Sequence, residues 1–146
     1  MKGLYVFILG AMMGGAIVSF AQAPNSPSVI EADAAPVRVA PSGKARVRPL
    51  ATGQEAFLGL LELDPGAAVP LHRDATEEYI YVLEGDGVMT LNGERVPIRP
   101  GTAVYMPANA EVSFTNGNAP TRVLQVFADP DPSSKYDAWT QSPPSP

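Results

Sequence analysis

The chain has 146 residues, of which 10 are Lys or Arg and 15 are Asp or Glu, so its formal net charge is −5, and it contains no cysteine. An acidic chain is a poor electrostatic partner for nucleic acid, and the lack of cysteine excludes disulfides, thiolate metal sites and cysteine nucleophiles. The 16 prolines argue against a helical bundle, because proline breaks the interior of helices. One domain fits this length, and short apolar runs between turn residues predict an all-β domain.

Residues 1–23 are typical of a secretory signal peptide. Met1 and Lys2 form a short positive start, residues 4–20 are almost entirely apolar, and Ala21-Gln22-Ala23 is a small-x-small cleavage site. The apolar run is shorter than the roughly 20 residues that a spanning helix prefers, which favours cleavage over a membrane anchor. We therefore expect an exported protein, periplasmic or secreted, that has no membrane contact after cleavage.

The rest of the chain is organised as short β-type runs between two polar ends. Residues 24–44 predict a linker and an N-terminal strand region, with the Pro-, Ser- and Ala-rich linker over 24–35. Residues 136–140 predict a terminal helical turn, and 141–146 a disordered tail. The predicted strands are 36–40, 45–50, 57–63, 78–83, 88–91, 95–98, 103–106, 111–114 and 121–127. So many short strands at this spacing indicate a closed sandwich or barrel.

One stretch combines side chains that are suited to chemistry. His72 is the only histidine of the chain, and Asp74 is two residues away, so on an extended backbone both side chains lie on the same side. Glu78 opens the next predicted strand with the same parity and can face back toward this pair. An imidazole and two carboxylates that converge inside a barrel are a suitable ligand set for a divalent metal ion, whose charge the carboxylates balance.

The sequence around these residues resembles the first motif of the cupin superfamily, small double-stranded β-helix barrels with jelly-roll topology. That motif reads glycine, five residues, His-x-His, three or four residues, glutamate, six residues and glycine. Gly66, His72, Glu78 and Gly85 match it with the correct spacing, and Asp74 stands where the second histidine is usual. The resemblance implies a single cupin barrel over residues 45–140.

The second cupin motif is less complete in this chain. It matches at Pro107 and Asn116, whereas Asn109 replaces its glycine and Val112 replaces its histidine ligand. Metal-binding cupins take ligands from both motifs, so the resemblance implies an incomplete site here, with at most three protein ligands.

Carried over to this chain, the ligand set is His72, Asp74 and Glu78. Because two of these three ligands are carboxylates, we expect a divalent ion such as manganese or iron, with zinc or nickel less favoured. His72 is also the candidate catalytic residue, as a base beside Asp74.

Three functions remain open at this point. The first is a metal-dependent enzyme, such as a dioxygenase or isomerase, that acts on a small organic molecule. The second is a metal-free module that binds a small molecule in an apolar cavity, which Val112 favours. The third is a metal-free acid–base isomerase that uses His72. Small cupins commonly dimerise through their N-terminal strands, so the resemblance also allows a homodimer, and it leaves the substrate open.

Two further groups have competing interpretations. The aromatic and thioether side chains either pack in the core or line a ligand cavity. The basic row on a predicted edge strand is either a charged edge that deters aggregation or an anion site. Glu78 could pair with an arginine, Arg73, Arg95 or Arg99, instead of a metal. The aromatic and thioether side chains are those of Tyr79, Tyr81, Tyr105, Met106 and Phe114, and the basic row is Arg38, Arg46 and Arg48.

Overall fold

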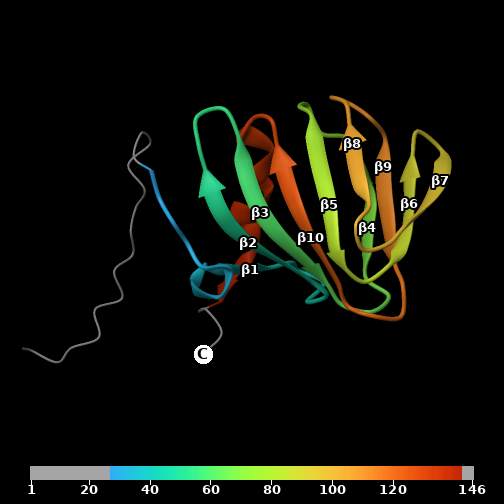
Figure 1. Ribbon diagram of the computed structural model, residues 1–146, viewed down its shortest axis with the longest axis horizontal. Helices are drawn as coiled ribbons and strands as arrows, with labels where there is room; N and C mark the ends of the chain where they lie inside the picture. The colour runs from blue at the N-terminus through green and yellow to red at the C-terminus, as the bar shows by residue number, and fades with distance from the viewer. Residues whose placement is uncertain (1–26, 143–146) are drawn as a thin grey trace, which may run out of the picture.

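Short antiparallel strands are the main secondary structure in the computed structural model, which describes residues 27–142 (Figure 1). Each of the nine predicted runs forms a strand, and two strands that the sequence pattern did not predict, β4 and β11, join them. The elements are η1 (Ala32–Ala34), β1 (Val37–Val39), β2 (Ala45–Thr52), β3 (Phe57–Leu63), β4 (Ala68–His72), β5 (Glu78–Glu84), β6 (Gly87–Leu91), β7 (Glu94–Ile98), β8 (Ala103–Met106), β9 (Val112–Asn116), β10 (Thr121–Phe127), η2 (Asp131–Ala138) and β11 (Thr140–Ser142).

The strands form two sheets that share one core. The larger sheet has the order β11-β1-β2-β3-β10-β5-β8, and the smaller sheet has the order β4-β9-β6-β7. Pro70 and Pro97 lie in β4 and β7, the two edge strands of the smaller sheet, where a missing N–H costs little. Buried side chains of both sheets, such as Leu61 and Val123 of one and Phe114 of the other, belong to one hydrophobic cluster. The predicted all-β jelly-roll domain is confirmed.

Alternation along β5 and β10 decides which side chains reach the interior. In β5, Glu78, Ile80 and Val82 are buried, while Tyr79 and Tyr81 are 43% and 48% exposed. Tyr105 of β8 is 53% exposed beside them on the outer face. The three tyrosines therefore neither pack in the core nor line the interior cavity, because their parity along the strands is outward. Met106 and Phe114 are buried, which agrees with the interpretation that they pack in the core.

The C-terminal segment differs from the sequence prediction. Helix η2 begins at Asp131, earlier than the expected turn at 136–140. Gln141 and Ser142, which were assigned to the tail, lie in β11, because this strand pairs with β1 through Val37 and Ser142. β1 is thus paired on both of its edges within the chain, with β11 and with β2. The predicted signal peptide and its cleavage site lie outside the described residues. Residues 27–142 include no helix with the length and apolar character needed to span a bilayer.

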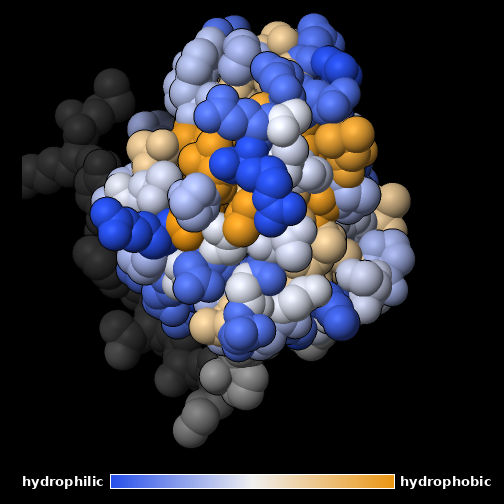
Figure 2. Space-filling model, turned by 90° about the vertical axis from the view of Figure 1, so that its right-hand side faces the viewer, coloured by the Kyte–Doolittle hydropathy of each residue, from blue (hydrophilic) through white to orange (hydrophobic). Residues whose placement is uncertain are grey.

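Figure 2 shows the side of the molecule that lies at the right of Figure 1, near β6 and β7. Hydrophilic residues surround the hydrophobic ones there and divide them into separate patches. This face therefore does not form one continuous apolar surface.

Candidate metal centre

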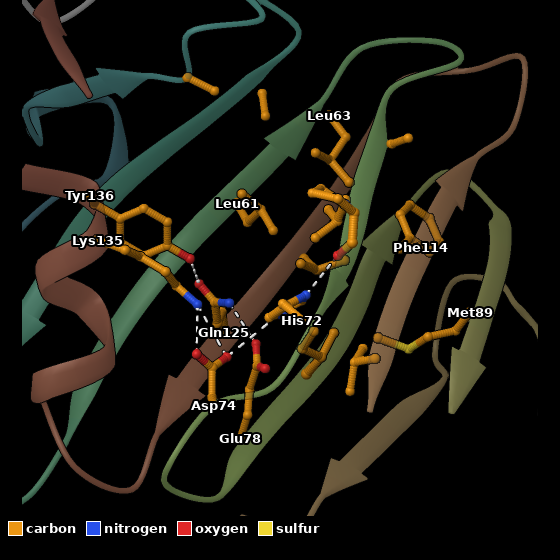
Figure 3. A pocket seen from close by; sticks show the side chains of 18 of the residues that line it. Leu61, Leu63, His72, Asp74, Glu78, Met89, Phe114, Gln125, Lys135 and Tyr136 are labelled. Atoms are coloured by element: carbon orange, nitrogen blue, oxygen red, sulfur yellow. Dashed lines mark hydrogen bonds and ion pairs between the residues drawn. The ribbon is translucent and has the colours of Figure 1, made fainter. Parts of the chain in front are cut away.

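Two sheets and the loop between them bring three predicted ligands together (Figure 3). His72 is the last residue of β4 in the smaller sheet, and Glu78 is the first residue of β5 in the larger one. Asp74 lies in the connecting loop. One ligand atom of each residue lies within 4.8 Å of those of the other two. The predicted convergence is confirmed, although the chain crosses between the sheets here instead of turning within one.

The imidazole of His72 has a defined orientation. Its Nδ1 lies 2.9 Å from the carbonyl oxygen of Pro70, which can only accept a hydrogen bond, so Nδ1 is the donor. The other ring nitrogen, Nε2, lies 3.6 Å from Oδ2 of Asp74. The ion pair with Asp74 raises the pKa of His72, although partial burial opposes this shift. Nε2 is therefore the nitrogen that faces the cluster.

Asp74 is held in place by contacts of its loop. Its carbonyl oxygen accepts a hydrogen bond from the backbone N–H of Asn109, whose φ of 63° is in the left-handed region that asparagine tolerates. The guanidinium of Arg73 donates to the carbonyl oxygen of Asn109 and to Glu111, each at 2.7 Å. Burial opposes the ionisation of Asp74, but His72 and Lys135 outweigh it and lower the pKa of the carboxyl.

Glu78 is 4% exposed and belongs to a buried chain of hydrogen bonds. Its Oε1 accepts a hydrogen bond from Nε2 of Gln125, whose Oε1 accepts one from the hydroxyl of Tyr136. Burial raises the pKa of Glu78 and also that of Tyr136, so the phenol stays protonated and donates. The alternative in which Glu78 pairs with Arg73 is wrong, because Arg73 binds Glu111.

Lys135 is a member of the site that sequence reasoning did not find. Its Nζ lies 3.1 Å from both carboxylate oxygens of Asp74 and 4.7 Å from the ring centroid of Phe127. Lys135 belongs to η2 and lies 61 positions beyond Asp74 in the sequence. A single lysine in a polar segment gives no sequence signal for such a contact.

A cavity of about 550 Å³ opens beside the three ligands. Its volume is in the range typical of small-molecule sites. Val112 faces His72 in the register of β4 and β9, so the position of the fourth cupin ligand holds an apolar side chain. The apolar lining includes Leu61, Leu63, Met89, Val112, Phe114 and Trp139.

The three side chains fit a divalent ion in chemistry and in spacing. Three atoms that share one ion at bond lengths of about 2.0–2.2 Å lie roughly 2.8–3.8 Å apart. Since the ligand atoms of His72, Asp74 and Glu78 lie within 4.8 Å of one another, side-chain movements of about one ångström bring them into range. A histidine ligand also commonly donates its second ring N–H to a carbonyl, as His72 does to Pro70.

The amino-acid sequence matches the family model of the cupin domain over residues 59–127. It is 34% identical over 113 residues to the dimethylsulfoniopropionate lyase DddW of Ruegeria pomeroyi, and the match covers 72% of this chain and 74% of the lyase. The chain belongs to the cupin superfamily. Among solved structures, this cupin resembles a predicted oxalate decarboxylase from Thermotoga maritima, with a TM-score of 0.62 and 26% identity over 70% of this chain and 99% of that one.

A second solved structure supports the fold alone. An RmlC-like cupin from Shewanella frigidimarina superposes with a TM-score of 0.65 at 15% identity, over 71% of this chain and 92% of that one. The family model ends at residue 127, before η2 and β11. Lys135 and Tyr136 therefore come to the site of this cupin from a segment beyond the matched region.

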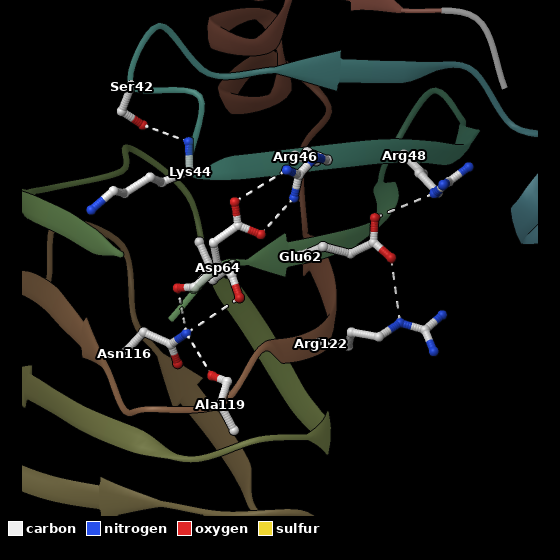
Figure 4. Close-up of polar contacts among 10 residues, drawn as sticks. Ser42, Lys44, Arg46, Arg48, Glu62, Asp64, Asn116, Ala119 and Arg122 are labelled. Atoms are coloured by element: carbon white, nitrogen blue, oxygen red, sulfur yellow. Dashed lines mark hydrogen bonds and ion pairs between the residues drawn. The ribbon is translucent and has the colours of Figure 1, made fainter. Parts of the chain in front are cut away.

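Asn116 of the second cupin motif belongs to a separate polar cluster, here called the Asn116 cluster and made of Asn116, Asp64, Thr121 and Arg46. Figure 4 shows Asn116, Asp64 and Arg46 of this cluster. The side-chain amide of Asn116 donates to the carbonyl oxygens of Leu63, Asp64 and Ala119, and its oxygen accepts from Thr121. Arg46 binds both carboxylate oxygens of Asp64, at 2.8 and 3.1 Å.

The basic row is satisfied within the fold. Besides the Arg46 contact, Arg48 lies 3.4 Å from Glu62, and Arg38 lies 4.0 Å from Asp137. Each arginine of the row thus already has a carboxylate partner, and the interpretation of the row as an anion site is wrong.

Proposed function

We propose that this cupin binds a divalent metal ion through His72, Asp74 and Glu78 and acts on a small organic molecule held in the adjoining cavity. The observation that carries this proposal is the orientation of His72. Its Nδ1–H is used by the carbonyl oxygen of Pro70, so Nε2 faces two carboxylates, an arrangement suited to a metal ion. Two carboxylate ligands favour manganese or iron over zinc or nickel.

The surrounding residues would give such a site its shape. A bound ion would act as a Lewis acid toward an oxygen atom of the small molecule. The Gln125 amide fixes Oε1 of Glu78, and the apolar side chains of Val112 and Phe114 keep the rest of the cavity dry. With three protein ligands, positions around an ion remain for the small molecule or water, as in catalytic metal sites.

The relatives support a small-molecule ligand. DddW is by name a lyase of dimethylsulfoniopropionate, and the Thermotoga maritima protein is described as a predicted oxalate decarboxylase. Both of these molecules are small enough for a cavity of about 550 Å³.

A second candidate function is metal-free acid–base chemistry at His72. The 3.6 Å approach of Nε2 to Asp74 and the raised pKa of His72 favour this alternative, because a carboxylate that orients an imidazole is suited to proton transfer. A metal-free module that binds a small molecule in the apolar cavity is the third alternative, and Val112 favours it.

Calorimetric titration of the metal-free chain with manganese, zinc and nickel separates these functions. We expect saturable binding of manganese by the wild-type chain and its loss in Glu78→Gln, which keeps the shape of the side chain but removes the charge. Glu94→Gln changes an exposed glutamate in the same way and is the matched control. If the wild-type chain binds none of the three ions, the metal function is wrong and the two metal-free alternatives remain.

We also propose that the protein is exported, periplasmic or secreted, after cleavage behind Ala23. The pattern of a positive start, an apolar run and a small-x-small site supports this. The intact mass of the exported protein should correspond to a chain that starts at Pro24. Recovery of the full-length chain in the membrane fraction would contradict the proposal.

A further inference from the structure

The cation nearest to the proposed ligands is part of the chain itself. Lys135 reaches Asp74 from η2 and contacts both carboxylate oxygens at 3.1 Å (Figure 3). Asp74 thus has an ammonium partner in the absence of a metal ion. An ion that takes one oxygen of Asp74 as a ligand competes with this ammonium for that oxygen and repels its positive charge.

Metal binding changes the balance of charges in the cavity wall. The charged side chains of the wall are His72, Arg73, Asp74, Glu78 and Lys135. Arg73 is already paired with Glu111 at 2.7 Å. The carboxylates of Asp74 and Glu78 together neutralise a divalent ion, while the imidazole is a neutral ligand. The positive charge of Lys135, in the wall of the cavity, is then no longer neutralised by Asp74.

The released ammonium has support that keeps it in place. Its Nζ lies 4.7 Å from the ring centroid of Phe127 and 5.7 Å from that of Tyr136. Aromatic faces at this distance attract a cation and stabilise its position. Tyr136 is itself fixed by its hydrogen bond to Gln125. The ammonium therefore remains beside the cavity when Asp74 turns away from it.

The rest of the cavity defines the other part of a ligand. Away from the polar end, the wall is formed by aliphatic and aromatic side chains, including Leu61, Met89 and Phe114. A molecule that fills this space needs an apolar body, and a molecule that pairs with the ammonium needs a negative group.

We propose that the ligand of this cavity is a small organic anion with an apolar body and that Lys135 binds its negative group. Asp74 is the partner of Lys135 until a metal ion binds Asp74. This inference rests on the proposed metal function. It names the ligand class and a binding residue that lies outside the region matched by the family model.

Hexanoate and 1-hexanol, which share an apolar body and differ in charge, are the probes. Each is titrated into the manganese-loaded wild-type chain, Lys135→Met and Lys44→Met, whose lysine is exposed and is not one of the residues that line the cavity. We expect Lys135→Met to bind hexanoate about tenfold more weakly, the size of a lost charge-assisted hydrogen bond, with hexanol binding unchanged. We expect Lys44→Met to resemble the wild type.

Metal affinity is the second readout. Because Lys135 competes for Asp74, Lys135→Met should bind manganese roughly two- to fivefold more tightly, as befits a half-exposed ion pair. Unchanged hexanoate binding, or weaker manganese binding, in Lys135→Met would overturn the inference.

A titration of metal-free variants tests the anion site independently of the proposed metal function. Asp74→Asn removes the internal partner of Lys135, so the metal-free variant should bind hexanoate more tightly than the wild type does. The double variant Asp74→Asn with Lys135→Met should lose this gain. If the wild type binds no manganese but Asp74→Asn gains hexanoate affinity, the metal function is wrong and the anion site stands. If Asp74→Asn gains nothing, the anion site is wrong.

Discussion

The Asn116 cluster and the proposed metal centre both consist of polar side chains from several segments of the chain. They differ in whether each hydrogen-bond acceptor has a donor. In the Asn116 cluster, donors meet acceptors: one amide serves three carbonyl oxygens, and Arg46 serves both oxygens of Asp64 (Figure 4). In the metal centre, Nε2 of His72 and the carboxylates of Asp74 and Glu78 all turn toward one another.

This difference distinguishes a cluster that stabilises the fold from a site that can bind a ligand. Matched donors and acceptors stabilise the folded chain and leave nothing for a ligand to satisfy. Converging acceptors repel one another unless a proton, an ammonium or a metal ion lies between them. In the structure, Lys135 supplies this charge at Asp74, and the raised pKa of His72 favours a proton on the imidazole; both cations can be displaced. The comparison therefore predicts that the two clusters fail differently when they are mutated.

Asn116→Ala should give the largest loss of stability. It removes the amide donor from the carbonyl oxygens of Leu63, Asp64 and Ala119 and the acceptor from one hydrogen bond of the Thr121 hydroxyl, and we expect a loss of roughly 2–4 kcal/mol in the free energy of unfolding. Urea denaturation measures this change, with the exposed neighbour in Asn118→Ala as control. Manganese affinity of the folded variant should stay within about twofold of the wild type. If metal binding disappears while the chain is still folded, the two clusters are not independent.

His72→Ala should show the opposite behaviour. Removing one of three ligands should weaken manganese binding by about a hundredfold or more, which corresponds to about 2.7 kcal/mol. The free energy of unfolding of the metal-free chain should change by less than about 1 kcal/mol, since the half-buried imidazole packs against few groups. Calorimetric titration and urea denaturation of the same preparation measure both quantities. A variant that keeps wild-type metal affinity would exclude His72 as a ligand.

Val112→His tests whether the metal centre can be completed. The new imidazole would face His72 across β4 and β9, at the position of the fourth ligand in the cupin motif. We expect manganese to bind roughly tenfold more tightly and the metal-free chain to lose about 1–3 kcal/mol, because the larger ring overpacks a buried site. Val112→Leu is the control for packing alone. Equal metal affinity of the histidine and leucine variants would show that the ring does not reach the ion.

The motif spacing predicted the three ligands because strand parity and cupin resemblance depend only on local sequence. His72, Asp74 and Glu78 lie within seven residues, and the crossing from β4 to β5 is short enough to bring them together. The motif also placed Gly85 correctly, and the structure shows why glycine is needed there: it has a φ of 80°, and a Cβ would collide with Oγ1 of Thr121.

The rest of the site could not be predicted, because it depends on contacts between distant segments. Lys135 and Tyr136 reach the cavity only because β11 pairs with β1 and holds η2 against the barrel. A three-residue strand with the sequence TQS has no hydrophobic alternation that would reveal it. The outward position of Tyr79 and Tyr81, by contrast, follows from the parity that places Glu78 inward, because these residues alternate with Glu78 along β5.

The smallest expected effect concerns the proton that occupies the centre in place of a metal ion. Asp74 raises the pKa of His72 above the value of about 6.5 in an unfolded chain, so folding is stabilised by the protonated imidazole. This contribution is complete below about pH 6.5 and is lost as the pH rises through the pKa of the folded state.

Because His72 is the only histidine, its ring protons give a single titration curve by NMR of the metal-free chain. We expect the midpoint above about 6.5 in the wild type and a lower one in Asp74→Asn, which removes the negative charge that favours the imidazolium. Bound manganese should abolish the titration, since the ion takes the place of the proton on Nε2, and acidification should in turn release the ion. A midpoint that is the same in both chains would show that Asp74 does not act on His72, and the contrast with the Asn116 cluster would then rest on Glu78 and Lys135 alone.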